Sequence, residues 1–442
     1  MVENYLAPEV INVKSLEKLI EGFYPEHEYR KTQWFRYTTE RIPIKLEKNP
    51  RYIQDEIERK CKPDRRLINH FEKEIVQTKT SYVVGNPIII NSYNEDEKID
   101  RFIETFNIRI NSEDLFHEVT NICSASGCCG VLLYKDRDAN PKAIQLKPYE
   151  YKVKYEMNEP QFAFRWFFKN EEEYFEYFTD DMIYYFTKDE NDNWFEYREP
   201  VLHGFGYIPI VEVKNNDERH SDYHSVTGLI DAYNRLISDF SNEVETFRLA
   251  YMILINMSAT NEDLQALRET GAISVDKDGD VKFLEKKIDS NAIETMRKIL
   301  ERNISRFSGH VVFSDNDFTG NLTRIAVTYK IRPLEIKSLV YELKMKTFLR
   351  EFYKVFASYK ANKVKFDYTD LVFTFTRNIP INLQEEVDVF VKLKGELSEK
   401  TRLSMLSFVD NPQDEKELLE EEEKKKKESE KPLNKEEFND EL

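Results

Sequence analysis

Two long amphipathic patterns, separated by a short hairpin pattern, constrain this chain more than any other feature. In the first pattern, apolar residues recur at close to 3.6-residue spacing over about six turns. They are Ile230, Tyr233, Leu236, Ile237, Phe240, Val244, Phe247 and Tyr251. This spacing predicts a helix of roughly 33 Å that begins near Leu229.

The second pattern predicts another helix of similar character. Asn291 can cap this helix with Glu294 reaching back to it, and Gly309 is a suitable end. Its apolar face comprises Ile293, Met296, Ile299, Leu300, Ile304 and Phe307. Between the two helices, residues 272–275 and 281–284 are expected to form strands joined through an Asp-Gly turn. Two helices joined by a small projecting module predict a stalk, which suits an assembly of many copies better than a compact enzyme.

The length and composition of the chain favour a soluble protein with two or more domains or an elongated subunit of several parts. A chain of 442 residues is too long for one ordinary core, and an apolar content of 40% is enough for real cores. The longest apolar run, residues 249–255, is far shorter than the roughly 18 residues needed to span a membrane. A formal charge of −17 argues against a protein built to grip nucleic acid, because such proteins normally present a basic face.

Cysteine usage and the N-terminus favour a reducing compartment. The four cysteines are Cys61, Cys123, Cys128 and Cys129, and their spacing fits no disulfide framework. Residues 1–10 lack the basic segment and apolar run of a secretory signal.

The residues before the first long helix are expected to contain both helices and strands. A helix is predicted over Arg66–Lys79, a strand broken by a turn over Tyr82–Ile90, and a helical stretch over Ile99–Cys129 that opens at Ser126. Aromatic residues dominate residues 147–213 in short runs separated by turn residues, which predicts an antiparallel meander. A single-strand-binding surface is the alternative for these aromatics, but their interleaved charges are mostly acidic, so a sheet core is favoured.

The remainder is expected to be largely helical. A helix over residues 325–359 contains Pro333 and should kink there. Residues 371–377 should form a strand, and a helix should run from Asn382 to Gly395. The charged tail is expected to be a solvated helix that frays. The fold class is therefore α+β.

Several residue clusters imitate functional motifs. Residues 276–280 resemble the start of a calcium loop, but Val281 stands where glycine is needed; residues 315–320 come closer, but Ala326 stands where a glutamate is needed. We interpret both as ordinary acidic loops. The cysteines and His117 lack zinc-ligand spacing and are interpreted as buried or scattered residues, so no metal or cofactor is expected.

A series of short motifs, in order from about residue 70 to 415, resembles the portal proteins of tailed bacteriophages. The resemblance is to the branch found in long-tailed phages of Gram-positive hosts. The motifs are Tyr82–Pro87, His203–Asn216, Ser221-Asp222, Leu229–Asn234, Arg306–Gly309, Asp317–Asn321, Tyr329-Lys330, Phe375–Asn382 and Phe408–Pro412. Each motif is weak alone, but their collinear order is specific.

The resemblance implies a non-enzymatic, portal-type elongated subunit of a ring, usually dodecameric, at one capsid vertex, through which double-stranded DNA enters and leaves. The implied parts are an N-terminal region and α/β wing (1–222), stem helices (223–250 and 289–308), a clip (251–288), a tunnel loop (309–324), a kinked channel helix (325–360), a wing return (361–396) and a helical crown with charged tail (397–442). The implied partners are other copies of the chain, the terminase large subunit, a head-completion adaptor, and scaffold and capsid proteins, with no membrane. The implied location is the virion, after assembly in the host cytoplasm.

The same resemblance implies roles for individual residues. The tunnel loop would include His310, Phe313, Asp315, Asp317, Phe318, Thr319, Gly320, Asn321 and Arg324. The clip would bind partners through Asn261, Asp263, Arg268, Asp276, Asp278 and Asp280. Because a conduit for a polyanion must not hold it, we hypothesise a slippery tunnel of acidic groups with transient basic contacts. The acidic groups are Asp239, Glu243, Glu245 and Glu294, and the basic ones are Arg324, Lys330 and Arg332.

Two other function classes remain as alternatives. One is a hydrolase or nuclease unrelated to phages, with a site assembled from dispersed acids, His117 and Cys128. The other is a monomeric interaction scaffold that docks partners on the stalk. Assembly state separates them, because a scaffold stays small whereas a portal forms closed rings.

Overall fold

The computed structural model describes most of the 442-residue chain, in stretches separated by gaps. The described residues are 11–38, 41–46, 64–94, 96–247, 251–255, 280–284, 289–311, 324–378 and 383–403, with residues 406, 409, 415–416 and 418–419 beyond them. The chain divides into two compact units. The first comprises Met1–Asn321 and Val327–Asn378, and the second comprises Leu322–Ala326 and Ile379–Leu442.

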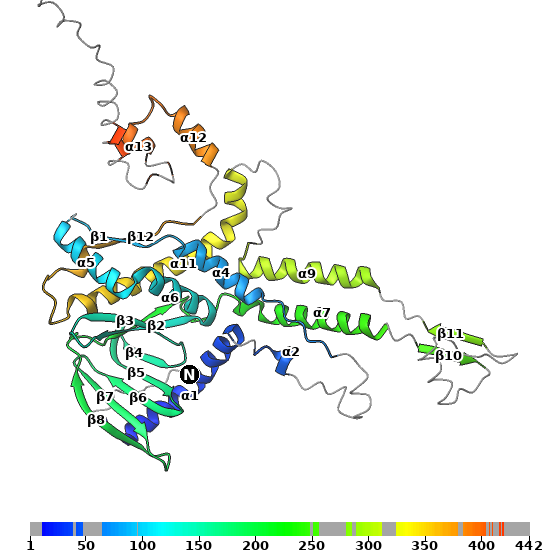
Figure 1. The fold of residues 1–442 in the computed structure, drawn as a ribbon, viewed down its shortest axis with the longest axis horizontal. Helices are drawn as coiled ribbons and strands as arrows, with labels where there is room; N and C mark the ends of the chain where they lie inside the picture. The colour runs from blue at the N-terminus through cyan, green and yellow to red at the C-terminus, as the bar shows by residue number, and fades with distance from the viewer. Residues whose placement is uncertain are drawn as a thin grey trace, which may run out of the picture. The chain divides into compact units, whose positions relative to one another are not determined.

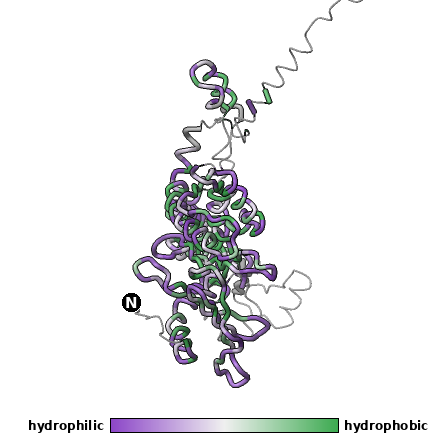
Figure 2. The backbone as a smooth tube through the Cα atoms, turned by 90° about the vertical axis from the view of Figure 1, so that its left-hand side faces the viewer, coloured by the Kyte–Doolittle hydropathy of each residue, from purple (hydrophilic) through white to green (hydrophobic). Residues whose placement is uncertain are grey.

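Helices and strands both contribute to the first unit, which confirms the α+β class. Its helices are α1 (Val13–Thr38), α2 (Pro43–Leu46), α4 (Phe71–Val84), α5 (Glu97–Ile110), α6 (Ser112–Ser126), α7 (Thr227–Phe247), α9 (Ser290–Ser308) and α11 (Arg324–Ala357), with short 3-10 turns η2 (His224–Val226) and η3 (Tyr368–Asp370). Residues 324–326 of α11 belong to the second unit. Figure 2 shows apolar positions gathered inside the first unit and polar positions along its outer turns.

Within the described residues, the strands form four separate sheets. They are β1 (Ile89–Ser92), β2 (Cys128–Lys135), β3 (Pro141–Leu146), β4 (Tyr151–Glu156), β5 (Glu159–Lys169), β6 (Glu172–Phe178), β7 (Met182–Lys188), β8 (Trp194–Leu202), β9 (Ile210–Lys214), β10 (Tyr251–Ile255), β11 (Asp280–Leu284) and β12 (Leu371–Thr374). The predicted meander is confirmed, because β4 to β8 form one antiparallel sheet in chain order. Helix α1 covers this sheet, with Phe23 packed edge-on against Phe164 in a shared apolar core (Figure 1).

A smaller sheet in the order β3-β2-β9 forms a second layer. Helix α6 packs on β2, the middle strand. The helical stretch predicted over residues 99–129 is in fact two helices, separated at Asn111, which adopts a left-handed conformation. Cys123, Cys128 and Cys129 are buried between these elements as free thiols, as their interpretation as buried residues requires.

Two predictions before residue 100 need correction. The helix expected over Arg66–Lys79 begins instead at Phe71 and continues to Val84, and its last three residues, Tyr82, Val83 and Val84, all have buried side chains. The strand therefore starts later, at Ile89. It pairs with β12, so that Ile90 lies opposite Phe373, a contact across more than half of the chain.

The two long mid-chain helices form where the periodicity predicts them. Helices α7 and α9 lie side by side (Figure 1). The first ends at Phe247, and Tyr251, expected in the helix, opens β10 instead, since residues 251–255 form a short apolar run of strand-forming residues. The second is capped by Asp289, not Asn291: the Asp289 carboxylate accepts hydrogen bonds from the backbone N–H groups of Asn291 and Ala292. Gly309 ends α9 with φ +67°, as expected.

The strand pairing between these helices differs from the prediction. Residues 281–284 do form a strand, β11, but the structure pairs β11 with β10, so that Ile253 lies opposite Lys282. The expected partner, residues 272–275, lies outside the described residues. An Asp-Gly turn is a local signal, whereas a pairing between residues about 30 apart is invisible to it.

The second unit contains short helices. They are α12 (Leu383–Lys392) and α13 (Glu399–Leu403). The helix predicted from Asn382 to Gly395 is thus found with an earlier end, and Asn382 lies outside the described residues. Within the ranges given above, every helix is too short or too polar to cross a lipid bilayer.

Candidate functional site at the base of the helix pair

Helices α7 and α9, here called the helix pair, share an apolar core with the rest of the first unit. Ile230 of α7 and Ile304 of α9 are both almost fully buried. The core also contains Tyr37, Ile75, Val76, Ala125, Tyr223, Val226, Tyr233 and Leu300. The residues near the base of the helix pair therefore find their apolar partners within the same chain.

Hydrogen bonds and ion pairs fix the helix pair in place. The Tyr233 hydroxyl donates to the Glu301 carboxylate at 2.8 Å, joining α7 to α9. The buried Arg36 guanidinium of α1 lies 2.7 Å from both the Asp231 and Glu72 carboxylates. Burial opposes the charge, but these two carboxylates raise the pKa of Arg36. One guanidinium thus joins α1, α4 and α7.

An extended segment, residues 64–70, runs along a second side of α7. The backbone N–H of Leu67 donates to the Ser238 hydroxyl at 2.9 Å, and that of Asn69 donates to the Asn234 side chain at 2.8 Å. Arg65 reaches the Glu245 carboxylate at 2.6 Å. This side of α7 is therefore covered within the chain.

The outer face of α9 remains apolar and exposed. Met296 is 45% exposed, Ile299 39% and Phe307 58%. Their spacing places them on one side of the helix. Four of the six residues predicted for the apolar face of α9 are therefore not buried deeply in the single chain, whereas Leu300 and Ile304 are.

Helix α11 carries a longer exposed apolar stripe. It consists of Tyr329, Ile336, Leu339, Val340 and Leu343, which are between 46% and 72% exposed. The opposite side of α11 is buried through Tyr341, Met345 and Phe348. A helix with apolar residues on both its buried and exposed sides indicates a further packing partner.

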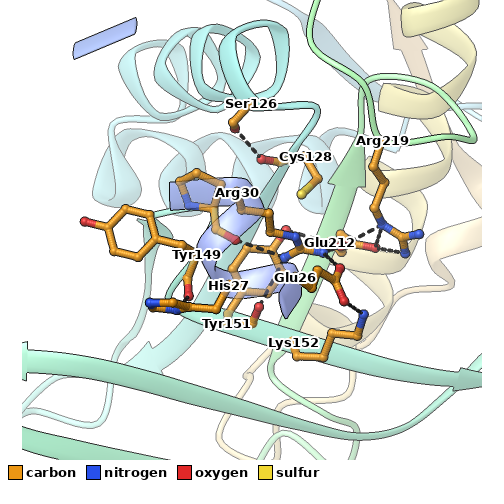
Figure 3. Close-up of polar contacts among 11 residues, drawn as sticks. Glu26, His27, Arg30, Ser126, Cys128, Tyr149, Tyr151, Lys152, Glu212 and Arg219 are labelled. Carbon is orange, nitrogen blue, oxygen red and sulfur yellow. Dashed lines mark hydrogen bonds and ion pairs between the residues drawn. The ribbon is translucent and has the colours of Figure 1, made fainter. Parts of the chain in front are cut away.

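A buried charge network fixes the chain just before α7 to the sheets. The Arg30 side chain of α1 is 3% exposed and donates to the backbone carbonyl oxygens of Pro148 at 2.9 Å and Tyr151 at 3.2 Å (Figure 3). The Glu212 carboxylate of β9 lies 3.6 Å from Arg30 and accepts a hydrogen bond from Arg219 at 2.7 Å. Burial works against ionisation, yet Arg219 and Arg30 hold the pKa of Glu212 below its ordinary value.

The turn that carries Arg219 depends on a glycine. Gly127, which ends α6, has φ +91°, and a Cβ there would lie 2.0 Å from the Arg219 carbonyl oxygen. The Gly127 carbonyl also accepts a hydrogen bond from the backbone N–H of Asn215 at 2.9 Å. Residues 215–219 therefore lie directly against the end of α6, and this close approach excludes any side chain at position 127.

A second buried charge cluster lies at the start of α7. Asp222 is 4% exposed, and its carboxylate lies 2.9 Å from the Lys79 ammonium and 3.0 Å from that of Lys337. Burial opposes ionisation, but the two ammonium groups hold the pKa of Asp222 well below its ordinary value. The cluster joins α4, the segment before α7, and α11 at one carboxylate.

The acidic residues proposed to face DNA have different surroundings. Asp239 is exposed on α7, whereas Glu245 is paired with Arg65. Glu294 pairs with Arg297 at 2.8 Å and Lys298 at 3.2 Å, and these contacts lower the pKa of Glu294 to about 2. Glu243 is half-buried and has interaction partners of its own.

The basic residues lie on or beside α11, but one loop residue is buried. Arg324 opens α11, and Lys330 and Arg332 are exposed further along it. His310 is 7% exposed, and its Nε2 lies 3.1 Å from the Glu74 carboxylate of α4. Its role in a tunnel loop stays a prediction.

The other predicted site residues cannot be placed. Those outside the described residues are Phe313, Asp315, Asp317, Phe318, Thr319, Gly320, Asn321, Asn261, Asp263, Arg268, Asp276 and Asp278. Asp280 is the first residue of β11. Their roles stay predictions.

The residues of the hydrolase alternative do not form a usable site. Cys128 is fully buried, and this burial raises the pKa of its thiol, which disfavours the thiolate needed for attack. His117 is exposed on α6 beside Glu118. Within the described ranges, no three histidine, cysteine or acidic side chains gather closely enough to hold a metal ion.

Sequence reasoning missed the charge clusters. In the sequence, Asp222 and Arg306 are notable only as parts of motifs that resemble the family. No local sequence pattern indicates that Asp222 pairs with Lys79 or Lys337. A charged residue within an apolar helix pattern, such as Lys79 in α4, is the one signal that points to a buried partner.

Comparison with known proteins identifies relatives over most of the chain. The sequence model of the family described as phage portal protein, SPP1 Gp6-like, matches residues 33–429. The portal protein of Bacillus phage SPP1 is 26% identical over 436 residues, which cover 90% of this chain and 84% of that protein. The portal protein of Clostridium phage phiCD119 is 28% identical over 225 residues, a match that spans 49% of this chain and 49% of that protein.

Among solved structures, a chain from the neck of a native GTA particle computed with C12 symmetry is 12% identical to this one. The superposition covers 76% of this chain and 88% of that chain, with a TM-score of 0.45. The family assignment is independent of this superposition, because the sequence model alone covers well over half of the chain. The chain belongs to the SPP1 Gp6-like family of phage portal proteins.

Proposed function

We propose that this protein forms a closed ring at the capsid vertex of a tailed phage and provides the channel for double-stranded DNA. The observation that carries the proposal is the exposed apolar face of α9. Helix α11 has a similar exposed apolar face. Ion pairs within the first unit already hold these helices in place. A second copy of the chain offers these faces a partner. Rotationally repeated contacts of this kind close into a ring.

The parts of the chain take the roles that the family resemblance implies. Residues 1–222 and 361–396 form the wing, α7 and α9 the stem, and residues 251–288 the clip. Residues 309–324 form the tunnel loop, residues 325–360 the kinked channel helix, and residues 397–442 the crown. A bend of α11 at Pro333 remains part of this proposal.

The channel is proposed to pass DNA without holding it. The chain carries a formal charge of −17, so a ring of many copies is strongly acidic. Exposed acids such as Asp239 weakly repel the duplex at every register, while Lys330 and Arg332 make transient contacts. Filter binding of the purified ring to duplex DNA at moderate salt tests this point: weak retention is expected, and tight, sequence-independent retention contradicts it.

The partners are proposed from the same roles. They are other copies of the chain, twelve to a ring, the terminase large subunit and the head-completion adaptor at the clip, and scaffold and capsid proteins at the wing and crown. The protein would assemble in the host cytoplasm and remain in the virion. We propose no catalytic step, because the family is a structural one and Cys128 is inaccessible to substrate.

Electron microscopy of the purified protein tests the proposed function. Closed rings with a central opening are expected, formed by the protein alone or after co-expression with the scaffold protein of its phage. Single-copy particles under both conditions would contradict the proposal.

A further inference from the structure

A hollow of about 370 Å³ lies at the base of the helix pair, where three separate parts of the chain meet. The segment before α7 contributes His220, Asp222 and His224, the end of α9 contributes Arg306, and α11 contributes Lys337. The hollow is open to solvent on one side and is bounded by the buried charge cluster on the other.

Two histidines form one wall. The rings of His220 and His224 are stacked, with their centroids 3.9 Å apart and their planes 16° from parallel. The turn that carries His220 is held by two hydrogen bonds with Asn216, and Arg219 anchors it to Glu212. Burial and the neighbouring His220 lower the pKa of His224, so the His224 ring favours its neutral form unless an anion lies beside it.

The floor of the hollow carries no free negative charge. The Asp222 carboxylate is neutralised by Lys79 and Lys337. The Lys337 ammonium also donates to the backbone oxygens of Asp222 at 2.7 Å and Ser308 at 2.9 Å, so its three donors are already used. The charges of Lys79, Lys337 and Asp222 add up to a net positive charge, and this sum does not depend on the protonation of either histidine.

Arg306 supplies a cation at the rim. It is exposed, and its guanidinium lies 5.7 Å from the centre of the Phe307 ring. A guanidinium fork and two imidazoles together match an oxyanion with several acceptor oxygens.

We propose that this hollow binds a phosphate-type oxyanion, held by the Arg306 guanidinium and by ring N–H groups of His220 and His224. The anion would join the segment before α7 to the end of α9, and so stiffen the base of the helix pair. The hollow lies within a single chain, so the proposal is independent of ring formation. Its oxyanion has two possible sources, a free inorganic ion or a backbone phosphate of nucleic acid.

Calorimetric titration of the purified protein with sodium sulfate tests the proposal. Sulfate is the probe because its charge does not change between pH 6 and pH 8, so any pH dependence comes from the protein. Binding is expected at pH 6 and should be about tenfold weaker at pH 8, because His224 loses any proton it carries as the pH rises. Arg306→Gln and the double variant His220→Gln with His224→Gln should each weaken binding at pH 6 by about tenfold or more.

Matched variants separate this site from general charge effects. Arg302→Gln removes an exposed arginine one turn earlier on α9, and His117→Gln removes an exposed histidine on α6; both should bind sulfate like the unmodified protein. Absence of binding at pH 6, or equal binding by the Arg306→Gln and Arg302→Gln variants, would overturn the proposal. Competition of a short DNA duplex with sulfate in the unmodified protein would identify nucleic acid as the source, and lack of competition would identify the free ion.

Discussion

The Arg36 guanidinium lies 2.7 Å from the Asp231 carboxylate, and this contact joins α1 to the second turn of α7. The same guanidinium lies 2.7 Å from Glu72 of α4, whose side chain is 3% exposed. Three elements of the first unit therefore depend on one buried cation, and the orientation of the helix pair depends on these elements.

Replacing this cation should be costly. We expect Arg36→Met to lower the free energy of unfolding by about 3 kcal/mol, because Glu72 is left buried without its partner. The double variant Arg36→Met with Glu72→Met should recover a large part of the loss, since no unpaired buried charge remains. Urea denaturation followed by circular dichroism measures both values. A double variant that is no more stable than Arg36→Met would contradict this explanation.

The Asp222 cluster should make stability depend on pH in the acid range. Asp222→Asn leaves Lys79 buried without its carboxylate and should cost about 3 kcal/mol at pH 7. The pKa of Asp222 is depressed below its ordinary value of 3.8 in the folded protein. Its contribution is therefore fully present above about pH 4 and is lost as the pH falls further.

The difference in unfolding free energy between the unmodified protein and Asp222→Asn should accordingly shrink below pH 4. Urea denaturation at pH 7, pH 4 and pH 3 provides the comparison. A difference that stays constant over this range would show that the carboxylate charge is not what stabilises the cluster.

Replacement by alanine should destabilise the protein at one glycine, Gly127, and not at another, Gly228. Gly127→Ala places a Cβ 2.0 Å from the Arg219 carbonyl oxygen at a left-handed position, and we expect a loss of at least about 2 kcal/mol. Gly228→Ala is the matched control, because Gly228 lies within α7 and a Cβ there has nothing within 4 Å. This control should be neutral or stabilising by up to about 1 kcal/mol. Thermal melts of both variants measure these changes in stability. Equal changes in melting temperature would contradict the close approach of the Arg219 carbonyl oxygen to position 127.

Arg30 should not be replaceable by lysine. The Arg30 guanidinium serves two backbone carbonyl oxygens and the Glu26 carboxylate at once, a geometry that a single ammonium cannot reproduce. We expect Arg30→Lys to cost about 2 kcal/mol. Lys31→Arg, at the next position on α1, is partly exposed and should change stability by less than about 0.5 kcal/mol. Equal melting temperatures for the two variants would contradict the role assigned to Arg30.

The elements that the sequence predicts best are those whose pattern is local. The meander and the helices α7 and α9 follow from periodicities of two and 3.6 residues, because one side of each element is buried within the chain. The end of α9 at Gly309 can also be predicted from local sequence, since the left-handed position at a helix end favours glycine.

Long-range contacts explain most of what the sequence does not predict. Ile90 of β1 pairs with Phe373 of β12. Each strand has its own alternating pattern, but nothing in either local sequence indicates that the two strands pair with each other. The same holds for β10 with β11, and for Asp222 with Lys79 and Lys337, whose partners come from α4 and α11. The cap of α9 is a further difference, because the structure has Asp289 where the sequence analysis expects Asn291. Both residue types can cap a helix, and the position at which the chain enters the helix decides which one does.

The exposed face of α9 provides the most direct test of the proposed ring. Native mass spectrometry of the purified protein should show a closed assembly of many copies, whereas the variant Met296→Ser with Ile299→Ser should remain a single folded chain, because it lacks the apolar contact between copies. Arg302→Ser, on the same helix, should assemble like the unmodified protein. An unmodified protein that stays a single chain even with its scaffold protein, or a Met296→Ser, Ile299→Ser variant that assembles to the same mass, would contradict the account.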